Sequence, residues 1–203
     1  MGKNIGLIPL GFTEIWSASF NSAIIISAGD NAEFIAFCGI NLDITIFNKE
    51  NVYLPAFLKT YPFLNVEVEN KDKKVNSLIA IDNNPKYVAK DKKIFILDKE
   101  KNLSKQVATK VELIKELNSQ RAVCRRIIAE LKKLDLLIKK DLRVKIEGKE
   151  EKVILEEFYV INIEKLLKLD DKIIASFAKK GWMGIFDAHF KSMGNFEKIL
   201  KAN

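Results

Sequence analysis

Three polar side chains near the C-terminus have the types and the spacing to act together. His189, Ser192 and Asn195 follow one another at intervals of three residues, and side chains at that spacing line one face of an α-helix. A histidine can change its charge near neutral pH and can serve as a general base or as a binding group. The stripe therefore indicates a binding surface or, as the structural alternative, a histidine in buried polar contacts that Ser192 and Asn195 complete.

The chemistry open to His189 is limited, because it is the only histidine in the chain. Zinc and iron sites that need two or more histidines cannot be built within one such chain, and we predict no metal site and no cofactor. A nucleophilic cysteine would need Cys38 or Cys124 to approach His189 in space. Both cysteines lie in apolar runs, where a small core side chain is the commoner explanation.

The composition describes a globular protein and limits the classes of partner. The chain has 203 residues, and its 34 Lys and Arg against 27 Asp and Glu leave a formal net charge of +7. Hydrophobic residues make up 48% of the chain, which is sufficient for a core at this length. Basic residues are interleaved with acidic ones, as in Lys149–Lys152, and this pattern is typical of a solvated face. We therefore do not expect nucleic acid as a partner.

The N-terminal segment lacks the pattern of a secretory signal. Met1–Phe12 contains one lysine, and Gly6, Pro9 and Gly11 interrupt its apolar stretch, whereas a signal has an unbroken apolar region of about 7–15 residues. No apolar run approaches the ~20 residues that cross a bilayer. We predict a cytoplasmic protein without a transmembrane segment. The sequence leaves open a signal-independent route to the cell surface.

The elements that must position the stripe are expected to form one α+β domain over residues 1–203. A short helix over Val52–Tyr61 should have Pro55 in its first turn. Charged or glycine-containing turns are expected at Asn70–Lys74 and Glu147–Lys149. Apolar runs and alternating patterns predict strands, paired in antiparallel sheet elements, at Ser22–Ser27, Glu33–Gly39, Asp43–Phe47, Phe63–Glu69, Ser77–Asp82, Ile94–Leu97, Leu142–Ile146 and Lys152–Ile161.

One long amphipathic helix is predicted from about Ser104 to Lys140, because apolar residues recur there in steps of three and four. Arg121 interrupts this apolar face. A buried arginine would need a carboxylate partner. The interpretation that we favour places its stem over apolar surface and its head in water. A C-terminal group of short helices should follow, at Ile163–Leu169, Asp170–Lys179 and Gly184–Leu200.

Trp182 lies just before the last of these helices, in an apolar block that we expect to pack against the core. An exposed tryptophan at this position would be an anchor for a partner protein.

The order of features from Tyr61 onward resembles the SapC family of bacterial surface-array, or S-layer, associated proteins. The similarity covers about residues 52–203 and begins with Tyr61-Pro62-Phe63. Its most specific segment is Gly181–Phe196, where a glycine and an apolar run precede Ala-His and then Ser and Asn. The strand-rich residues 1–51 show the weakest resemblance.

The resemblance implies an accessory role in the synthesis, export or display of a surface protein, with a surface-layer protein or its secretion machinery as the partner. It carries over no catalytic residue. We therefore expect a non-catalytic interaction protein, and the alternative is an enzyme that modifies a polypeptide with His189 as general base. The candidate binding residues are His189, Ser192, Asn195, Trp182 and Tyr61. The sequence does not define the oligomeric state.

Overall fold

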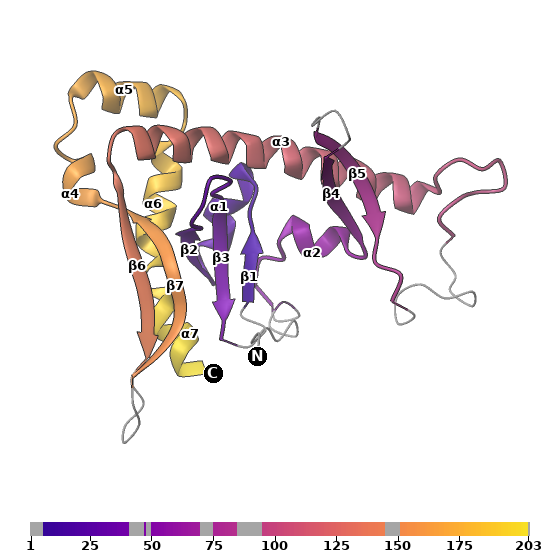
Figure 1. Cartoon of the computed structure of the whole chain (residues 1–203), viewed down its shortest axis with the longest axis horizontal. Coiled ribbons are helices and arrows are strands. Elements are labelled where there is room, and N and C mark those ends of the chain that lie inside the picture. The colour runs from indigo at the N-terminus through magenta and orange to yellow at the C-terminus, as the bar shows by residue number, and fades with distance from the viewer. Residues whose placement is uncertain are drawn as a thin grey trace. The chain divides into compact units, whose positions relative to one another are not determined.

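The computed structural model of the chain combines helices with antiparallel strands, which confirms the α+β prediction. The chain divides into two compact units (Figure 1). The sheet unit comprises Met1–Leu54 together with Gln120–Asn203, and the hairpin unit comprises Pro55–Ser119. That the chain acts as a single domain stays a prediction. The structure describes residues 6–40, 47, 50–69, 75–84, 95–144 and 151–202.

The sheet unit contains a five-stranded antiparallel sheet with the order β1-β3-β2-β7-β6. The N-terminal strands join the C-terminal hairpin where Ile26 pairs with Tyr159. The first part of the chain is therefore part of the same sheet as the C-terminal hairpin. The strands are β1 (Gly6–Pro9), β2 (Ala23–Ile26), β3 (Phe34–Gly39), β6 (Leu137–Val144) and β7 (Lys152–Ile161).

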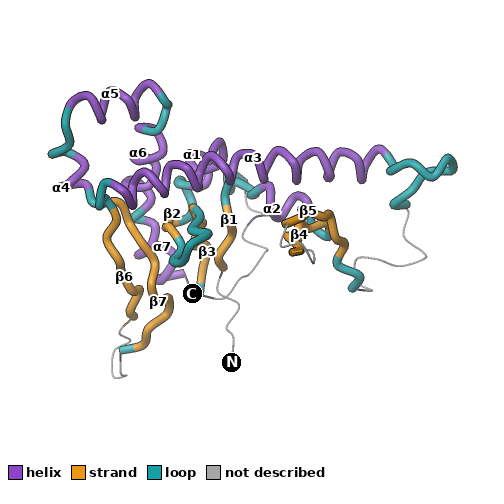
Figure 2. Tube along the Cα trace, turned by 45° about the horizontal axis from the view of Figure 1, so that its top comes forward, coloured by secondary structure: helices purple, strands orange, loops and turns teal. Residues whose placement is uncertain are grey.

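Most helices of the sheet unit follow β7 in the chain (Figure 2). Asp170 caps α5 by accepting a hydrogen bond from the backbone N–H of Lys172, as expected for an aspartate before a helix. The predicted last helix is two helices, because the chain turns at Met193–Gly194. The helices that lie entirely within this unit are α1 (Ile15–Ala18), α4 (Ile163–Leu166), α5 (Asp171–Lys179), α6 (Met183–Ser192) and α7 (Asn195–Ala202), with a 3-10 turn at Phe12–Glu14.

Strand β2 is the most deeply buried strand of the sheet. All four of its side chains are buried, as a continuous apolar run predicts for a strand covered on both faces. On one face Ala23 packs with Phe37 of β3 and with Ile199 of α7. Helix α7 therefore covers one end of this face of the sheet.

The long helix α3 (Lys105–Lys133) is shorter than predicted. It ends with hydrogen bonds from the N–H of Leu136 to the carbonyl of Leu131 and from the N–H of Asp135 to that of Lys132, the pattern of a Schellman cap. Asp135 takes the left-handed conformation, with φ 53°. Because that position holds aspartate instead of the usual glycine, the sequence carried no stop signal. The predicted helical residues after Leu136 belong instead to β6.

The hairpin unit contains α2 (Ala56–Thr60), β4 (Phe63–Glu69), β5 (Val75–Ile81) and the first part of α3, up to Ser119. Strands β4 and β5 pair antiparallel, as expected for Phe63–Glu69 and its predicted partner strand at Ser77–Asp82, and Phe63 lies opposite Ile81. Pro55 directly precedes α2 and is not within its first turn. The core is a small cluster formed by Phe63, Val107, Val111 and Ile114, against which Ile81 packs.

One predicted strand is wrong in the described residues. Phe95, Ile96 and Leu97 were expected in a buried strand, but all three are exposed, and Leu97 forms only an isolated bridge with Leu103. An apolar run by itself does not supply a partner strand, which is why the prediction failed. The predicted turns at Asn70–Lys74 and Glu147–Lys149, and the predicted strand at Asp43–Phe47 apart from Phe47, lie outside the described residues.

Candidate functional site

The polar stripe of His189, Ser192 and Asn195 lies inside the sheet unit. The exposed fractions of these residues are 0%, 0% and 5%. His189 and Ser192 are on α6, whereas Asn195 begins α7. A partner at the molecular surface cannot reach these side chains in this structure, so the stripe is an interior one.

Helix α6 uses two of these side chains to bind backbone N–H groups of the sheet. The Ser192 hydroxyl accepts a hydrogen bond from the N–H of Ile24 at 2.9 Å and donates to the His189 carbonyl at 2.7 Å. His189 Nε2 accepts from the N–H of Ile161 at 3.0 Å. Each bond satisfies a buried donor that would otherwise lack an acceptor.

The register of the sheet explains why those two donors are available. Strands β2 and β7 pair at Ile26 and Tyr159, so the antiparallel ladder, if continued, would place Ile24 opposite Ile161. The ladder stops before that point. Ser192 and His189 therefore replace the missing ladder bonds, and α6 holds the diverging ends of β2 and β7.

Asn195 fixes the start of α7 in a similar way. Its side-chain Nδ2 donates to the carbonyls of Ser19 and Ser22, at 2.8 and 3.0 Å. Both carbonyls belong to the segment between α1 and β2. Ser192 and His189 therefore join α6 to the sheet, and Asn195 joins α7 to the segment before β2, through the buried polar contacts that the structural alternative describes.

The environment of His189 leaves no base for catalysis at neutral pH. Burial lowers the pKa of His189 to about 4, so the ring is neutral. Because Nε2 accepts the Ile161 hydrogen bond, the neutral ring carries its proton on Nδ1. Its accepting nitrogen is therefore already occupied by the protein backbone.

The two cysteines are also unsuited to nucleophilic chemistry. Both are buried and free. Burial raises the pKa of Cys124 to about 12 and raises the pKa of Cys38. Both thiols are therefore protonated at neutral pH, whereas the thiolate is the nucleophile.

Trp182 and Tyr61 belong to different units. Trp182 precedes α6 and is half-buried, with its ring stacked on Phe177 at a centroid distance of 5.5 Å and with Lys180 Nζ 4.6 Å from its centroid. Tyr61 lies in the hairpin unit, and its hydroxyl donates to the carboxylate of Asp82. That hydrogen bond lowers the pKa of Asp82. Both side chains thus have partners within their own unit.

Arg121 is paired with a carboxylate, so the solvated arrangement that we favoured is wrong. Its guanidinium donates to both oxygens of Glu33, at 2.8 and 2.7 Å, and Arg125 donates to the same carboxylate at 2.9 Å. Burial alone would raise the pKa of Glu33, but the two arginines lower it. The sequence could not show that Glu33, in the turn before β3, lies beside α3.

A second polar cluster that the sequence did not indicate surrounds Glu14. This buried carboxylate accepts hydrogen bonds from the N–H of Gly11 at 2.8 Å and from the Tyr53 hydroxyl at 2.9 Å. Burial and the charge of Glu14 raise the pKa of Tyr53. A Cβ at Gly11 would collide with the side chain of Gln120, whose Cβ would be 3.0 Å away. A larger residue at position 11 would therefore require the Gln120 side chain to move.

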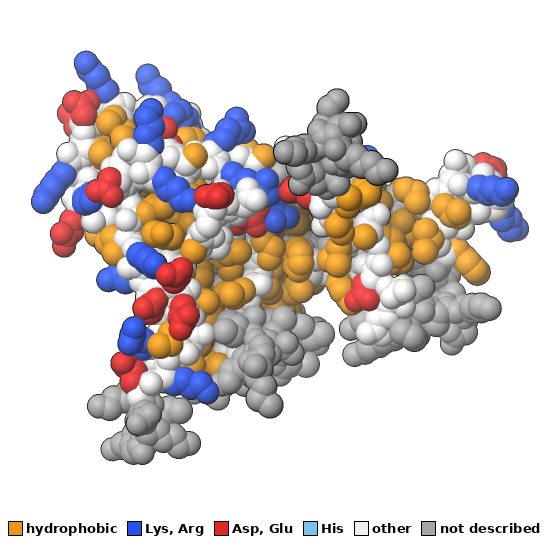
Figure 3. Space-filling view, viewed as in Figure 1, with side chains coloured by type: hydrophobic (Ala, Val, Ile, Leu, Met, Phe, Trp, Pro, Cys, Tyr) orange, Lys and Arg blue, Asp and Glu red, His pale blue; other side chains and the backbone are white. Residues whose placement is uncertain are grey.

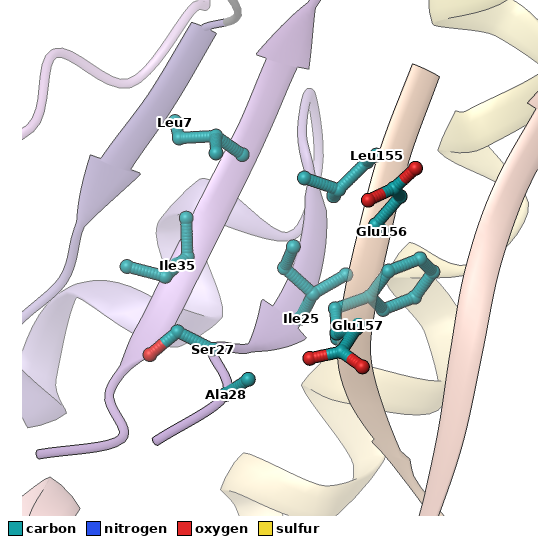
Figure 4. Close-up of a pocket in the computed structure, with 9 residues that line it drawn as sticks. Leu7, Ile25, Ser27, Ala28, Ile35, Leu155, Glu156 and Glu157 are labelled. Atoms are coloured by element: carbon teal, nitrogen blue, oxygen red, sulfur yellow. The ribbon is translucent and has the colours of Figure 1, made fainter. Parts of the chain in front are cut away.

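An open groove lies on the sheet, between β1, β2 and β3 on one side and β7 on the other (Figure 4). Its volume is about 400 Å³. Ile25 and Phe158 are buried, Leu7 is 39% exposed, and the carboxylates of Glu156 and Glu157 add negative charge to the lining. The lining residues are Leu7, Ile25, Ser27, Ala28, Ile35, Leu155, Glu156, Glu157 and Phe158.

A β-bulge in β7 shapes this groove. Lys140 pairs with Phe158 and Leu142 pairs with Leu155, so β7 has one residue more than β6 in this interval. Glu157 takes a φ of 53°, and its N–H donates to Asp141 Oδ1 at 2.9 Å. In a regular strand Leu155 and Phe158 would face opposite sides. The bulge allows both side chains to line the groove.

The apolar lining and the adjacent carboxylates can bind an apolar side chain next to a cation. The Glu157 carboxylate already forms an ion pair with Lys139, whereas Glu156 is exposed and no ion pair of its carboxylate occurs within the described residues. Glu156 is therefore the group that can bind a cation from a ligand. The sequence placed Glu156 and Glu157 at the surface but did not indicate the groove.

Comparison with known proteins identifies the family. Within the described part of the chain, no helix combines the length and the apolar character needed to cross a membrane. No curated protein and no solved structure gives a match to the chain. The family model described as SapC matches residues 1–199, which extends the similarity through the N-terminal strands that had shown the weakest resemblance. The chain therefore belongs to the SapC family.

Proposed function

We propose that this protein is a non-catalytic accessory protein in the production, export or display of a bacterial surface-layer protein, and that it binds a partner polypeptide in the groove of the sheet unit. Membership of the SapC family supports the biological setting. The observation that carries the binding mode is the apolar groove with Glu156 beside it.

The groove favours an extended segment with an apolar side chain followed by lysine or arginine. The apolar side chain would contact Ile35 and Leu155, which are only half-buried without a ligand. The cation would pair with Glu156. Burial of apolar surface supplies affinity at such a site, and the charge selects among segments.

The buried position of His189 argues against the enzyme alternative. Its accepting nitrogen is bonded to the backbone of β7, and its exposed fraction is 0%. A general base needs hydrogen-bond access to the substrate proton.

The proposal can be tested by affinity capture from native cytosolic and surface fractions, with mass spectrometry. The wild-type protein is expected to recover a surface-layer protein or a component of its exporter. Leu7→Lys and Glu156→Lys should each lower that recovery about tenfold, which corresponds to a loss of roughly 1.4 kcal/mol of binding free energy. The fraction that contains the protein also tests the predicted cytoplasmic location.

Leu167→Lys is the matched control, because Leu167 is 77% exposed and does not line the groove. It should leave recovery unchanged. Circular dichroism confirms that each variant is folded. Recovery of the same surface-layer protein by both groove variants at the wild-type level would rule out the groove as the binding site. If the wild-type protein recovers neither a surface-layer protein nor an exporter component, the proposed accessory function is contradicted.

A further inference from the structure

The outer edge of β5 has no partner strand within the part of the chain that the structure describes. The N–H of Asp82 donates to the carbonyl of Pro62 at 2.9 Å, which makes these two residues a hydrogen-bonded pair of the ladder. Hydrogen-bonded and non-hydrogen-bonded pairs alternate along an antiparallel ladder, so the N–H groups of Ser77 and Ile79 point away from β4. Among the described residues, no strand pairs with this edge.

The composition of β5 differs from that of most exposed edges. Its sequence, VNSLIAI, contains no charged residue, no proline and no glycine. Natural proteins protect edges with charges, proline or bulges, because a flat uncharged edge pairs with other strands. Strand β4 carries Glu67 and Glu69. The hairpin therefore has one acidic edge and one neutral edge.

The two faces of the hairpin also differ. Phe63 and Ile81 pack with residues of α3. On the opposite face, Val66 and Leu78 form a cross-strand pair, and their exposed fractions are 39% and 53%. Figure 3 shows hydrophobic side chains gathered on the visible surface over β5. The exposed face and the neutral edge meet at Leu78.

We propose that two copies of the chain pair through the outer edges of β5, antiparallel, and form a four-stranded sheet with the order β4-β5-β5-β4. In the register with the longest overlap, Ser77 exchanges hydrogen bonds with Ile79 of the partner subunit. Leu78 then lies opposite the partner subunit's Leu78 as a non-hydrogen-bonded pair, in which side chains approach most closely.

A second copy fits this edge because an antiparallel pair of identical strands has two-fold symmetry, the commonest symmetry of soluble dimers. The uncharged strand brings no like charges together. Pairing through β4 would instead bring together two edges that carry glutamates. The inference is independent of the proposed function, since β5 is in the hairpin unit and the groove is in the sheet unit.

The first test is sedimentation velocity of the full chain at micromolar concentrations. The wild type should form dimers. Ile79→Pro removes an outward N–H without removing a bond to β4, and it should raise the dimer dissociation constant by at least about tenfold. Glu67→Pro removes the corresponding outward N–H of β4 and should leave the dimer intact. Leu78→Lys keeps every backbone group, places two cations opposite each other and should also give monomers.

Crosslinking tests the register directly. In Leu78→Cys the two introduced cysteines would lie about 4.5 Å apart between Cα atoms, within the range of a disulfide, so mild oxidation should give covalent dimers. Val66→Cys is the matched control on the same face. Its two copies would be separated by about three strand spacings of 4.8 Å each and should not crosslink.

A wild type that remains monomeric would overturn the proposal. Dimers that persist in Leu78→Lys, or the absence of a crosslink in Leu78→Cys, would equally overturn it. Because Leu78→Lys and Leu78→Cys leave the backbone unchanged, the test stands even if Ile79→Pro does not fold.

Discussion

Among the described residues, the sheet unit buries more large apolar side chains than it exposes, whereas the hairpin unit exposes more of them than it buries. In the sheet unit, β2 is buried on both faces and the C-terminal helices supply further core residues, including Phe177 and Phe186. In the hairpin unit, the cluster around Phe63 is small. Within the described part of this unit, the exposed large apolar side chains are Val66, Val68, Leu78, Ile79, Phe95, Ile96, Leu97 and Leu103.

This difference separates a stable framework from a candidate interface. Monomeric soluble proteins rarely expose contiguous apolar patches larger than a few hundred Å² unless these bind something. In the sheet unit, the Ser192 hydroxyl and His189 Nε2 form buried hydrogen bonds with backbone N–H groups of β2 and β7. The hairpin unit instead leaves an apolar face and a neutral edge without partners among the described residues. We therefore expect core substitutions to cost most in the sheet unit.

The largest expected effect comes from truncating one core phenylalanine in each unit. Phe34→Ala should lower the free energy of unfolding by about 3–5 kcal/mol, because Phe34 has an exposed fraction of 0%. Phe63→Ala should cost about 3 kcal/mol, since its cluster is smaller and partly exposed.

Native-state hydrogen exchange locates these two losses. Phe63→Ala should remove protection from amides of the hairpin unit alone, and Phe34→Ala should lower protection throughout the sheet unit. Equal loss in both units after Phe63→Ala would mean that the units unfold together, and the comparison would then fail.

The next effect is a pH dependence that arises in the sheet unit. The pKa of His189 is about 4 in the folded protein and about 6.5 when unfolded. The unfolded chain therefore binds a proton first as the pH falls. Neutral His189 therefore contributes fully to the free energy of unfolding above about pH 6.5, and this contribution is lost as the pH falls towards 4. The difference between the two pKa values corresponds to about 3 kcal/mol.

Urea unfolding of the wild type and of His189→Gln at a series of pH values measures this contribution. The glutamine keeps a hydrogen-bond acceptor but does not titrate. The free energy of unfolding of this variant should therefore fall less than that of the wild type between about pH 6.5 and pH 4. Parallel pH profiles for the two proteins would show that His189 is not the group responsible.

A smaller loss is expected at the ion pairs that join the turn before β3 to α3. Arg121→Lys removes the two-pronged contact with Glu33 while Arg125 remains, and it should cost about 1–2 kcal/mol. Thermal unfolding at low and high salt checks this, with Arg126→Lys as the control on the exposed side of the same helix. An equal effect of the two substitutions would mean that the Glu33 contact adds no stability.

The smallest effect should come from the exposed face of the hairpin unit. Val66→Thr is expected to change the free energy of unfolding by less than about 0.5 kcal/mol, because Val66 is exposed. Ile24→Thr in the sheet unit is the comparison. Because the Ile24 side chain is fully buried, this substitution should lower the free energy of unfolding more than Val66→Thr does. Chemical denaturation at low protein concentration distinguishes them. A large loss for Val66→Thr would show that this face is covered within the monomer.

Local patterns predicted the elements better than they predicted the site. The apolar runs at Ser22–Ser27 and Glu33–Gly39 contain the observed β2 and β3, and the alternation of Phe63–Glu69 matches β4. These patterns succeed because they depend only on local residue spacing. The end of α3 was missed because Asp135 takes the position that glycine usually marks. The partner of Arg121 was missed because Glu33 is distant in sequence.

The sequence by itself determined the α+β class, most strands, the spacing of the His189 stripe and the resemblance to the SapC family. Those features depend on local periodicity and on residue types. Only the tertiary structure decided that the stripe faces inward, since the open ladder between β2 and β7 supplies its donors. It likewise decided that Leu155 and Phe158 share a groove, because the bulge at Glu157 depends on pairing with β6.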